Sequence, residues 1–157
     1  MKPAIFSLLL LAVPALAQER PATYNGNLYA TAFAGACQHG YGLFGGGGGA
    51  EGLIWKGVSL GVEGSYQSFT DGWGFGMFTV QPGYHFKGRN RAAKWDPFVT
   101  FGIGGVAGNH GGFGGAANVG AGANYWYKDK MAFRFEGRVQ SFAEEGMFVF
   151  GVGLSFR

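Results

Sequence analysis

The sequence carries little charge. Asp, Glu, Lys and Arg make up 13% of its 157 residues, about half of the roughly 25% that is usual in soluble domains. The formal net charge of +3 is too small to indicate a nucleic-acid-binding protein. Such a composition indicates that something other than water covers much of the folded surface.

Cysteine is almost absent. Cys37 is the only one, so the chain cannot form an internal disulfide. His39, His85 and His110 have no Cys or carboxylate at the spacing of a metal site. We therefore predict neither a metal nor a cofactor.

Long apolar runs are missing except at the N-terminus. Lys2, the apolar residues 4–13 and the small residues 15–17 form the pattern of a secretory signal peptide. The run is shorter than the roughly 20 residues that a membrane-spanning helix needs. We predict a signal peptide over residues 1–17, a polar leader over 18–26 and one β-barrel domain over 27–157.

Glycine, in contrast, is the most frequent residue, with 32 copies. The run over residues 45–49 has the composition of a flexible linker, but Phe44 and the pair Ile54-Trp55 flank it. We predict a strand here, in which missing side chains allow tight curvature or a close approach across the interior. No G-K-[ST] motif follows the glycines, so a phosphate-binding loop is not indicated.

Alternation of apolar and polar residues runs through the mature chain. Over residues 131–140 one face carries Met131, Phe133, Phe135 and Val139, and the other carries Arg134, Glu136, Arg138 and Gln140. A period of two predicts a strand. The chain divides into eight such segments of roughly ten residues each, the length that crosses a membrane as a tilted strand. Pro82 lacks a backbone donor and predicts a bulge or a strand end.

Which face looks inward decides the class of protein. In a soluble ligand-binding barrel the apolar face packs inside, whereas in a membrane barrel it meets lipid. The polar faces are rich in Gly, Ser, Thr and Asn, which suit the narrow lumen of an eight-stranded barrel. The apolar faces carry aromatic residues near strand ends, as membrane girdles do: Tyr66, Tyr84, Phe86, Tyr125, Tyr127 and Phe156. We predict an all-β, eight-stranded antiparallel up-and-down transmembrane barrel, with the soluble barrel as the alternative.

This orientation places isolated charges in the lumen. They are Glu51, Glu63, Arg134, Glu136 and Arg138. Charges in a narrow interior must be paired, because an unpaired buried charge costs several kcal/mol. We predict a salt-bridge network that plugs the barrel, with a gated ion path as the alternative.

Two segments resemble a known family. The sequence from Gly120 through the turn at residues 128–130 to Arg138 resembles a hairpin of small OmpA-like and OmpX-like outer-membrane barrels. Gly151, Leu154 and Phe156 resemble the C-terminal signal that the barrel-assembly machinery reads.

The resemblance implies an integral outer-membrane protein of a Gram-negative type of cell, with both termini in the periplasm. The implied partners are outer-membrane lipids and the assembly machinery, and no nucleic acid. A monomer is expected, and since the sequence ends at Arg157, no peptidoglycan-binding domain is expected. The outer loops would lie near His39, Asp71 and His110, and their surface ligand stays open.

The resemblance specifies the fold better than the activity. Some eight-stranded barrels are lipid A deacylases that use a His with a nearby Ser, but neither His85 nor His110 has a Ser two residues later. We therefore predict no catalytic residues and a structural or surface-interaction role. A narrow gated pore and a lipid-modifying enzyme are the alternatives.

Overall fold

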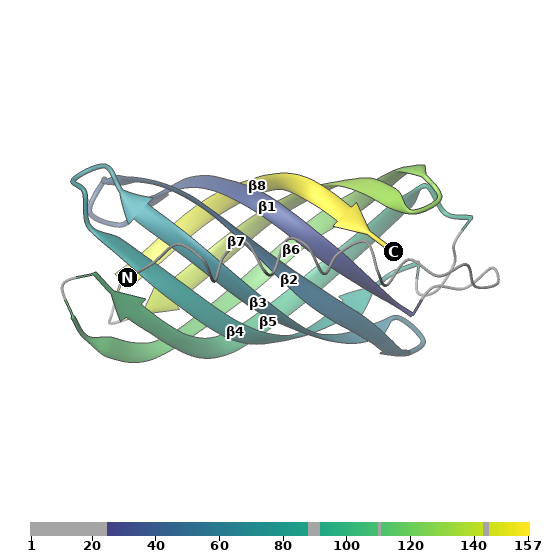
Figure 1. The fold of residues 1–157 in the computed structure, drawn as a ribbon, viewed down its shortest axis with the longest axis horizontal. Helices are drawn as coiled ribbons and strands as arrows, with labels where there is room; N and C mark the ends of the chain where they lie inside the picture. Colours follow the sequence, from purple (N-terminus) through teal and green to yellow (C-terminus); the bar gives the residue numbers. More distant parts are fainter. Residues whose placement is uncertain (1–24, 88–91, 110, 143–144) are drawn as a thin grey trace, which may run out of the picture.

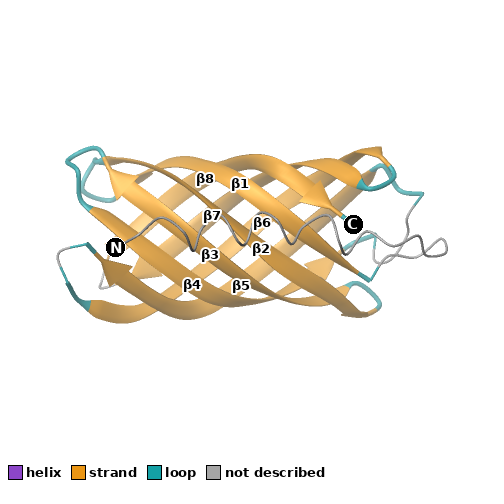
Figure 2. Ribbon diagram, viewed as in Figure 1, coloured by secondary structure: helices purple, strands orange, loops and turns teal. Residues whose placement is uncertain are grey.

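A computed structural model describes residues 25–87, 92–109, 111–142 and 145–157. These residues form eight strands, arranged as Figure 1 and Figure 2 show: β1 (Gly26–Cys37), β2 (Gly42–Trp55), β3 (Val58–Phe69), β4 (Gly74–His85), β5 (Trp95–Gly108), β6 (Phe113–Lys128), β7 (Met131–Phe142) and β8 (Glu145–Phe156). The predicted signal peptide and most of the predicted leader lie outside the described residues. Within those residues, no helix has the length and apolar character to cross a membrane.

The strands form one closed antiparallel sheet. Each strand pairs with the next in sequence, and β1 pairs with β8, for example at Leu28 and Phe156. Closure pairs the backbone groups that an open sheet would leave along its edges. The predicted eight-stranded up-and-down barrel is therefore confirmed.

The two ends of the barrel differ. Lys56-Gly57 joins β2 to β3 with positive φ angles of 43° and 95°, as tight hairpin turns require. This turn, the connections after β4 and β6, and Arg157 lie at one end, which we call the C-terminal end. The connections after β1, β3 and β5 lie at the opposite end.

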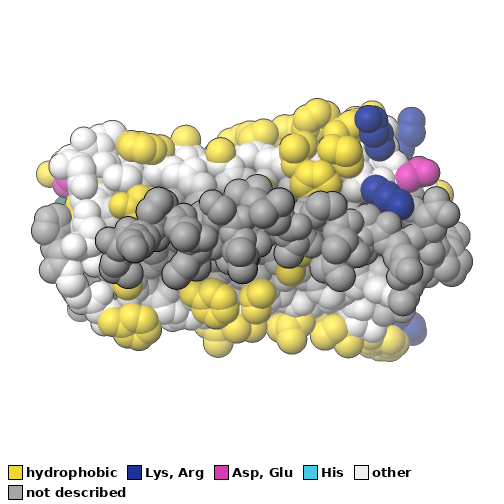
Figure 3. All heavy atoms as spheres, in the orientation of Figure 1, with side chains coloured by type: hydrophobic (Ala, Val, Ile, Leu, Met, Phe, Trp, Pro, Cys, Tyr) yellow, Lys and Arg dark blue, Asp and Glu magenta, His cyan; other side chains and the backbone are white. Residues whose placement is uncertain are grey.

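Apolar side chains cover the outer wall. Figure 3 shows hydrophobic side chains along the barrel and Lys and Arg side chains gathered at one end. The predicted lipid-facing aromatics all lie on this wall, with Tyr66, Tyr84, Phe86 and Tyr127 exposed, and Tyr125 and Phe156 half-buried.

Pro82 neither creates a bulge in its strand nor ends it. Val80 pairs with Ile103 and Gly83 with Thr100, so the register between β4 and β5 is the same on both sides of the proline. The ladder to β5 is interrupted at Gln81 and Pro82, while the pairing of Pro82 with Leu60 of β3 persists. The predicted bulge or strand end is wrong, because ladder bonds on either side hold the strand through one missing donor.

The glycine run forms part of β2, as predicted. Its glycines lie beside large inward side chains of neighbouring strands. Tyr29 of β1 pairs with Gly49, and a Cβ at Gly49 would lie 2.6 Å from the Tyr29 hydroxyl oxygen. Phe98 of β5 likewise pairs with Gly122, where a Cβ would lie 2.7 Å from its ring. Missing side chains on one strand thus make room in the lumen for rings from another.

Candidate functional site

Arg138 lies at the centre of a charged network in the lumen. Its two terminal nitrogens donate to both carboxylate oxygens of Glu63 on β3, at 2.9 Å for Nη2 to Oε2. Its Nε donates to Oε1 of Glu136 at 2.8 Å. All three side chains are fully buried, so this guanidinium links β7 to β3 across the barrel.

Arg134 extends the network toward the C-terminal end. Its Nε donates to Oε2 of Glu136 at 3.0 Å, and its Nη1 lies 3.6 Å from Oε1 of Glu51. The guanidinium carbon lies 4.1 Å from the ring centre of Tyr29 and 4.0 Å from that of Phe98. Contact with two aromatic faces stabilises a buried cation by cation–π attraction. The structure thus places all five predicted lumen charges in one connected group.

His85 and Asp96 belong to the same network, and the sequence prediction missed them. His85 Nδ1 lies 2.8 Å from Asp96 Oδ2, and its Nε2 lies 3.0 Å from Glu51 Oε2. Because carboxylates only accept hydrogen bonds, both contacts form when both ring nitrogens carry a proton. The signal was available in the alternation, which gives His85 the same inward face as Gln81.

The charges of this network nearly balance. Four carboxylates, on Glu51, Glu63, Asp96 and Glu136, face two guanidinium groups and one imidazole. Selectivity filters that are built from charged side chains instead use rings of one sign. In the described part of the chain, no group of three His, Cys, Asp or Glu residues could hold a metal ion.

A pair of amides lies beyond the charged network. Gln67 of β3 donates from Nε2 to Oε1 of Gln140 on β7 at 3.0 Å. Both side chains are buried. Along their strands, Gln67 lies between Glu63 and Phe69, and Gln140 lies between Arg138 and Phe142. This hydrogen bond between the two side-chain amides therefore marks the boundary between the charged and the apolar parts of the lumen.

The part of the lumen nearer the opposite end is apolar. We call its packed side chains the apolar cluster: Phe33, Leu43, Phe69, Phe75, Met77, Val106, Ala116, Phe142, Met147 and Val149. The rings of Phe75 and Phe142 lie 4.7 Å apart, and Trp73 stacks on Phe142 at 5.8 Å. The expectation that polar faces fill the lumen is therefore wrong for this half. Apolar side chains can fill an interior when they pack on one another and leave no polar group unpaired.

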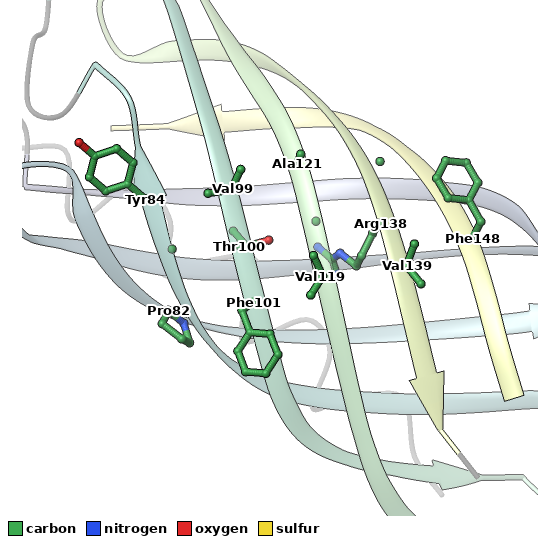
Figure 4. A pocket seen from close by; sticks show the side chains of 13 residues that line it. Pro82, Tyr84, Val99, Thr100, Phe101, Val119, Ala121, Arg138, Val139 and Phe148 are labelled. Atoms are coloured by element: carbon green, nitrogen blue, oxygen red, sulfur yellow. The ribbon is translucent and has the colours of Figure 1, made fainter. Parts of the chain in front are cut away.

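An apolar groove crosses the outer wall. Its volume is about 630 Å³, and Figure 4 shows Tyr84, Phe101 and Phe148 around the smaller Val119 and Ala121. The only charged residue lining it is Arg138, whose guanidinium is bonded to carboxylates in the lumen. The groove is lined mainly by apolar side chains, with hydroxyl groups from Tyr84 and Thr100 among them.

The fold has counterparts among solved outer-membrane proteins. OprG from Pseudomonas aeruginosa matches with a TM-score of 0.64 and 8% identity, over 85% of this chain and 96% of OprG. The N-terminal β-barrel domain of OprF from the same species matches with a TM-score of 0.60 and 20% identity, over 83% of this chain and 96% of that domain. The outer-membrane enzyme PagL matches with a TM-score of 0.59 and 16% identity, over 82% of this chain and 99% of PagL. No protein-family model and no curated protein sequence matches the chain.

These likenesses and the closed antiparallel sheet define the class. The chain has the fold of the small eight-stranded outer-membrane β-barrels, so the OmpA-like and OmpX-like resemblance is confirmed at the level of the fold. At such low identities the likeness carries no activity with it.

Proposed function

We propose that this chain is an integral outer-membrane barrel that neither conducts ions nor catalyses a reaction, with a structural or surface-interaction role. The observation that carries this proposal is the filling of the lumen by two different layers. The charged network around Arg138 occupies one part, and the apolar cluster around Phe75 occupies the other.

Each layer opposes conduction for its own reason. An ion that passes the apolar cluster loses its hydration without gaining ligands, and hydrophobic constrictions exclude water. An ion that passes the charged network must displace Arg138 from Glu63 and Glu136, which leaves buried charges unpaired at a cost of several kcal/mol. Two independent barriers in series support a plugged barrel over a gated path.

The distribution of histidine supports a role without catalysis. Of the described histidines, His85 points into the lumen, where two carboxylates bind it, and His39 lies in the connection after β1. Neither lies on the strands' outer wall, where a lipid substrate would meet a catalytic base.

Planar-bilayer recordings test the proposal. We expect no steady channels from the purified barrel, and none from Arg138→Ala, because the apolar cluster still spans the other half of the lumen. Val139→Ala, on the outer face beside Arg138, is the matched control. Steady channels from the native chain that Arg138→Ala enlarges would show instead that the charged network gates an ion path.

A further inference from the structure

The described cations outside the lumen all lie at the C-terminal end. They are Lys56, Lys87, Lys94, Lys128, Lys130 and Arg157. Figure 3 shows Lys and Arg side chains gathered beyond the hydrophobic wall at this end. Asp129 is the one carboxylate side chain outside the lumen that the structure describes there, so six cationic side chains lie at the same end as one acidic side chain.

Four of these cations have no oppositely charged partner within the part of the chain that the structure describes. Among the described residues, Lys56, Lys87, Lys94 and Lys128 form no ion pair with a carboxylate. We call these four lysines the basic collar. The acidic side chains of the lumen lie within strands and not in the three connections at this end, so the positive charge of the collar is left for a ligand outside the chain.

The basic collar lies beside exposed aromatic rings. Lys56 Nζ lies 4.8 Å from the ring centre of Trp55, and Lys128 Nζ lies 5.9 Å from that of Tyr127. Lys94 directly precedes the exposed Trp95. Aromatic residues at the ends of membrane strands sit at headgroup level, and Lys side chains beside them extend their ammonium groups into the same layer.

We propose that the basic collar binds the phosphates of anionic phospholipids in the leaflet around the C-terminal end. The lysines combine unpaired charge with a position at the edge of the apolar wall, and anionic surfaces attract juxtamembrane Lys residues. The inference rests on the proposed membrane insertion but not on the proposed lack of conduction.

The test compares two lipids around the same barrel. The mature chain is reconstituted in phosphatidylcholine vesicles that contain spin-labelled phosphatidylglycerol or spin-labelled phosphatidylcholine. Electron spin resonance then measures the fraction of each label that the protein immobilises. We expect roughly threefold preference for phosphatidylglycerol at low salt, which shrinks in high salt as the charges are screened. Replacing the collar by K56Q, K87Q, K94Q and K128Q together is expected to reduce this preference by half or more.

Two single substitutions provide matched controls. Asp129→Asn removes the anion at the C-terminal end and is expected to increase the preference. Asp71→Asn changes the net charge equally at the opposite end and is expected to leave it unchanged. Heat-dependent gel mobility verifies that each variant is folded.

Equal immobilisation of both lipids by the native chain, or an unchanged preference in the fourfold variant, would overturn the proposed lipid binding. Failure of the native chain to enter the vesicles would contradict the membrane role itself. The two failures are therefore distinguishable.

Discussion

Arg138 shows how one side chain joins distant parts of the chain. Glu63 lies 75 positions away in sequence, yet its two oxygens accept hydrogen bonds from the same guanidinium. Planar, bidentate geometry of this kind suits Arg and not Lys. The residue therefore fixes the distance between β3 and β7 across the barrel.

Arg138→Ala is expected to lower the free energy of unfolding by about 3–5 kcal/mol, because it leaves Glu63 and Glu136 as buried charges without their main partner. Urea unfolding of the reconstituted barrel, followed by tryptophan fluorescence, measures this. Adding Glu63→Gln to the variant should recover part of the lost free energy of unfolding, since a neutral amide then replaces one of the unpaired buried carboxylates. A loss below about 1 kcal/mol, the range of exposed pairs, would mean that water reaches the network.

At the scale of the strand, β2 is distinguished by the side chains that its glycines lack. Its inward glycines leave the space that the aromatic rings of β1 occupy, as Tyr29 does beside Gly49. The Tyr29 hydroxyl can then donate to Glu63 Oε2 at 2.9 Å. Glycine in this strand thus contributes to the charged network by making room for one of its members.

Gly49→Ala tests this role of glycine. The added Cβ would overlap the Tyr29 ring and the Val62 carbonyl oxygen, so we expect the free energy of unfolding to fall by about 1–3 kcal/mol, as in overpacked cores. Gly64→Ala in β3 is the control, because its Cβ would meet no atom within 4 Å.

For the control, stability should stay constant or rise by up to about 1 kcal/mol, since alanine restricts the unfolded chain. Equal effects of the two substitutions in urea unfolding would contradict the steric explanation.

The whole molecule is asymmetric along its axis. The C-terminal end carries the basic collar and the charged network, and the opposite half of the lumen carries the apolar cluster. In the topology that the family resemblance implies, the first end faces the periplasm. Export and insertion would then be prerequisites for every property proposed for the barrel.

Fractionation of cells that produce the full chain tests this expectation. The protein should stay in the outer-membrane fraction after carbonate or urea washing, because its apolar wall remains in lipid. Its intact mass should correspond to a chain that begins at Gln18, after removal of the predicted signal peptide. Recovery in the soluble periplasm would contradict the membrane barrel.

Much of the fold could be predicted from the sequence. Every predicted strand is present, and residues such as Arg134 and Phe135 take the opposite faces that the alternation indicates. The prediction failed at Pro82, where the strand continues, and in the half of the lumen nearer the opposite end, where inward residues such as Phe75 are apolar. The prediction assumed that every inward face is polar, and this assumption does not hold for apolar residues such as Phe75, which the alternation alone would place on the inward face.

The sequence by itself determined the number of strands and the face of each side chain, because the period-two alternation can be recognised within the residues of a single strand. The tertiary structure decided which inward side chains meet. Contacts such as Arg138 with Glu63, His85 with Asp96 and Glu51, and Phe75 with Phe142 cross the lumen or join neighbouring strands. They depend on closure and on the stagger between strands, which no pattern within one strand records.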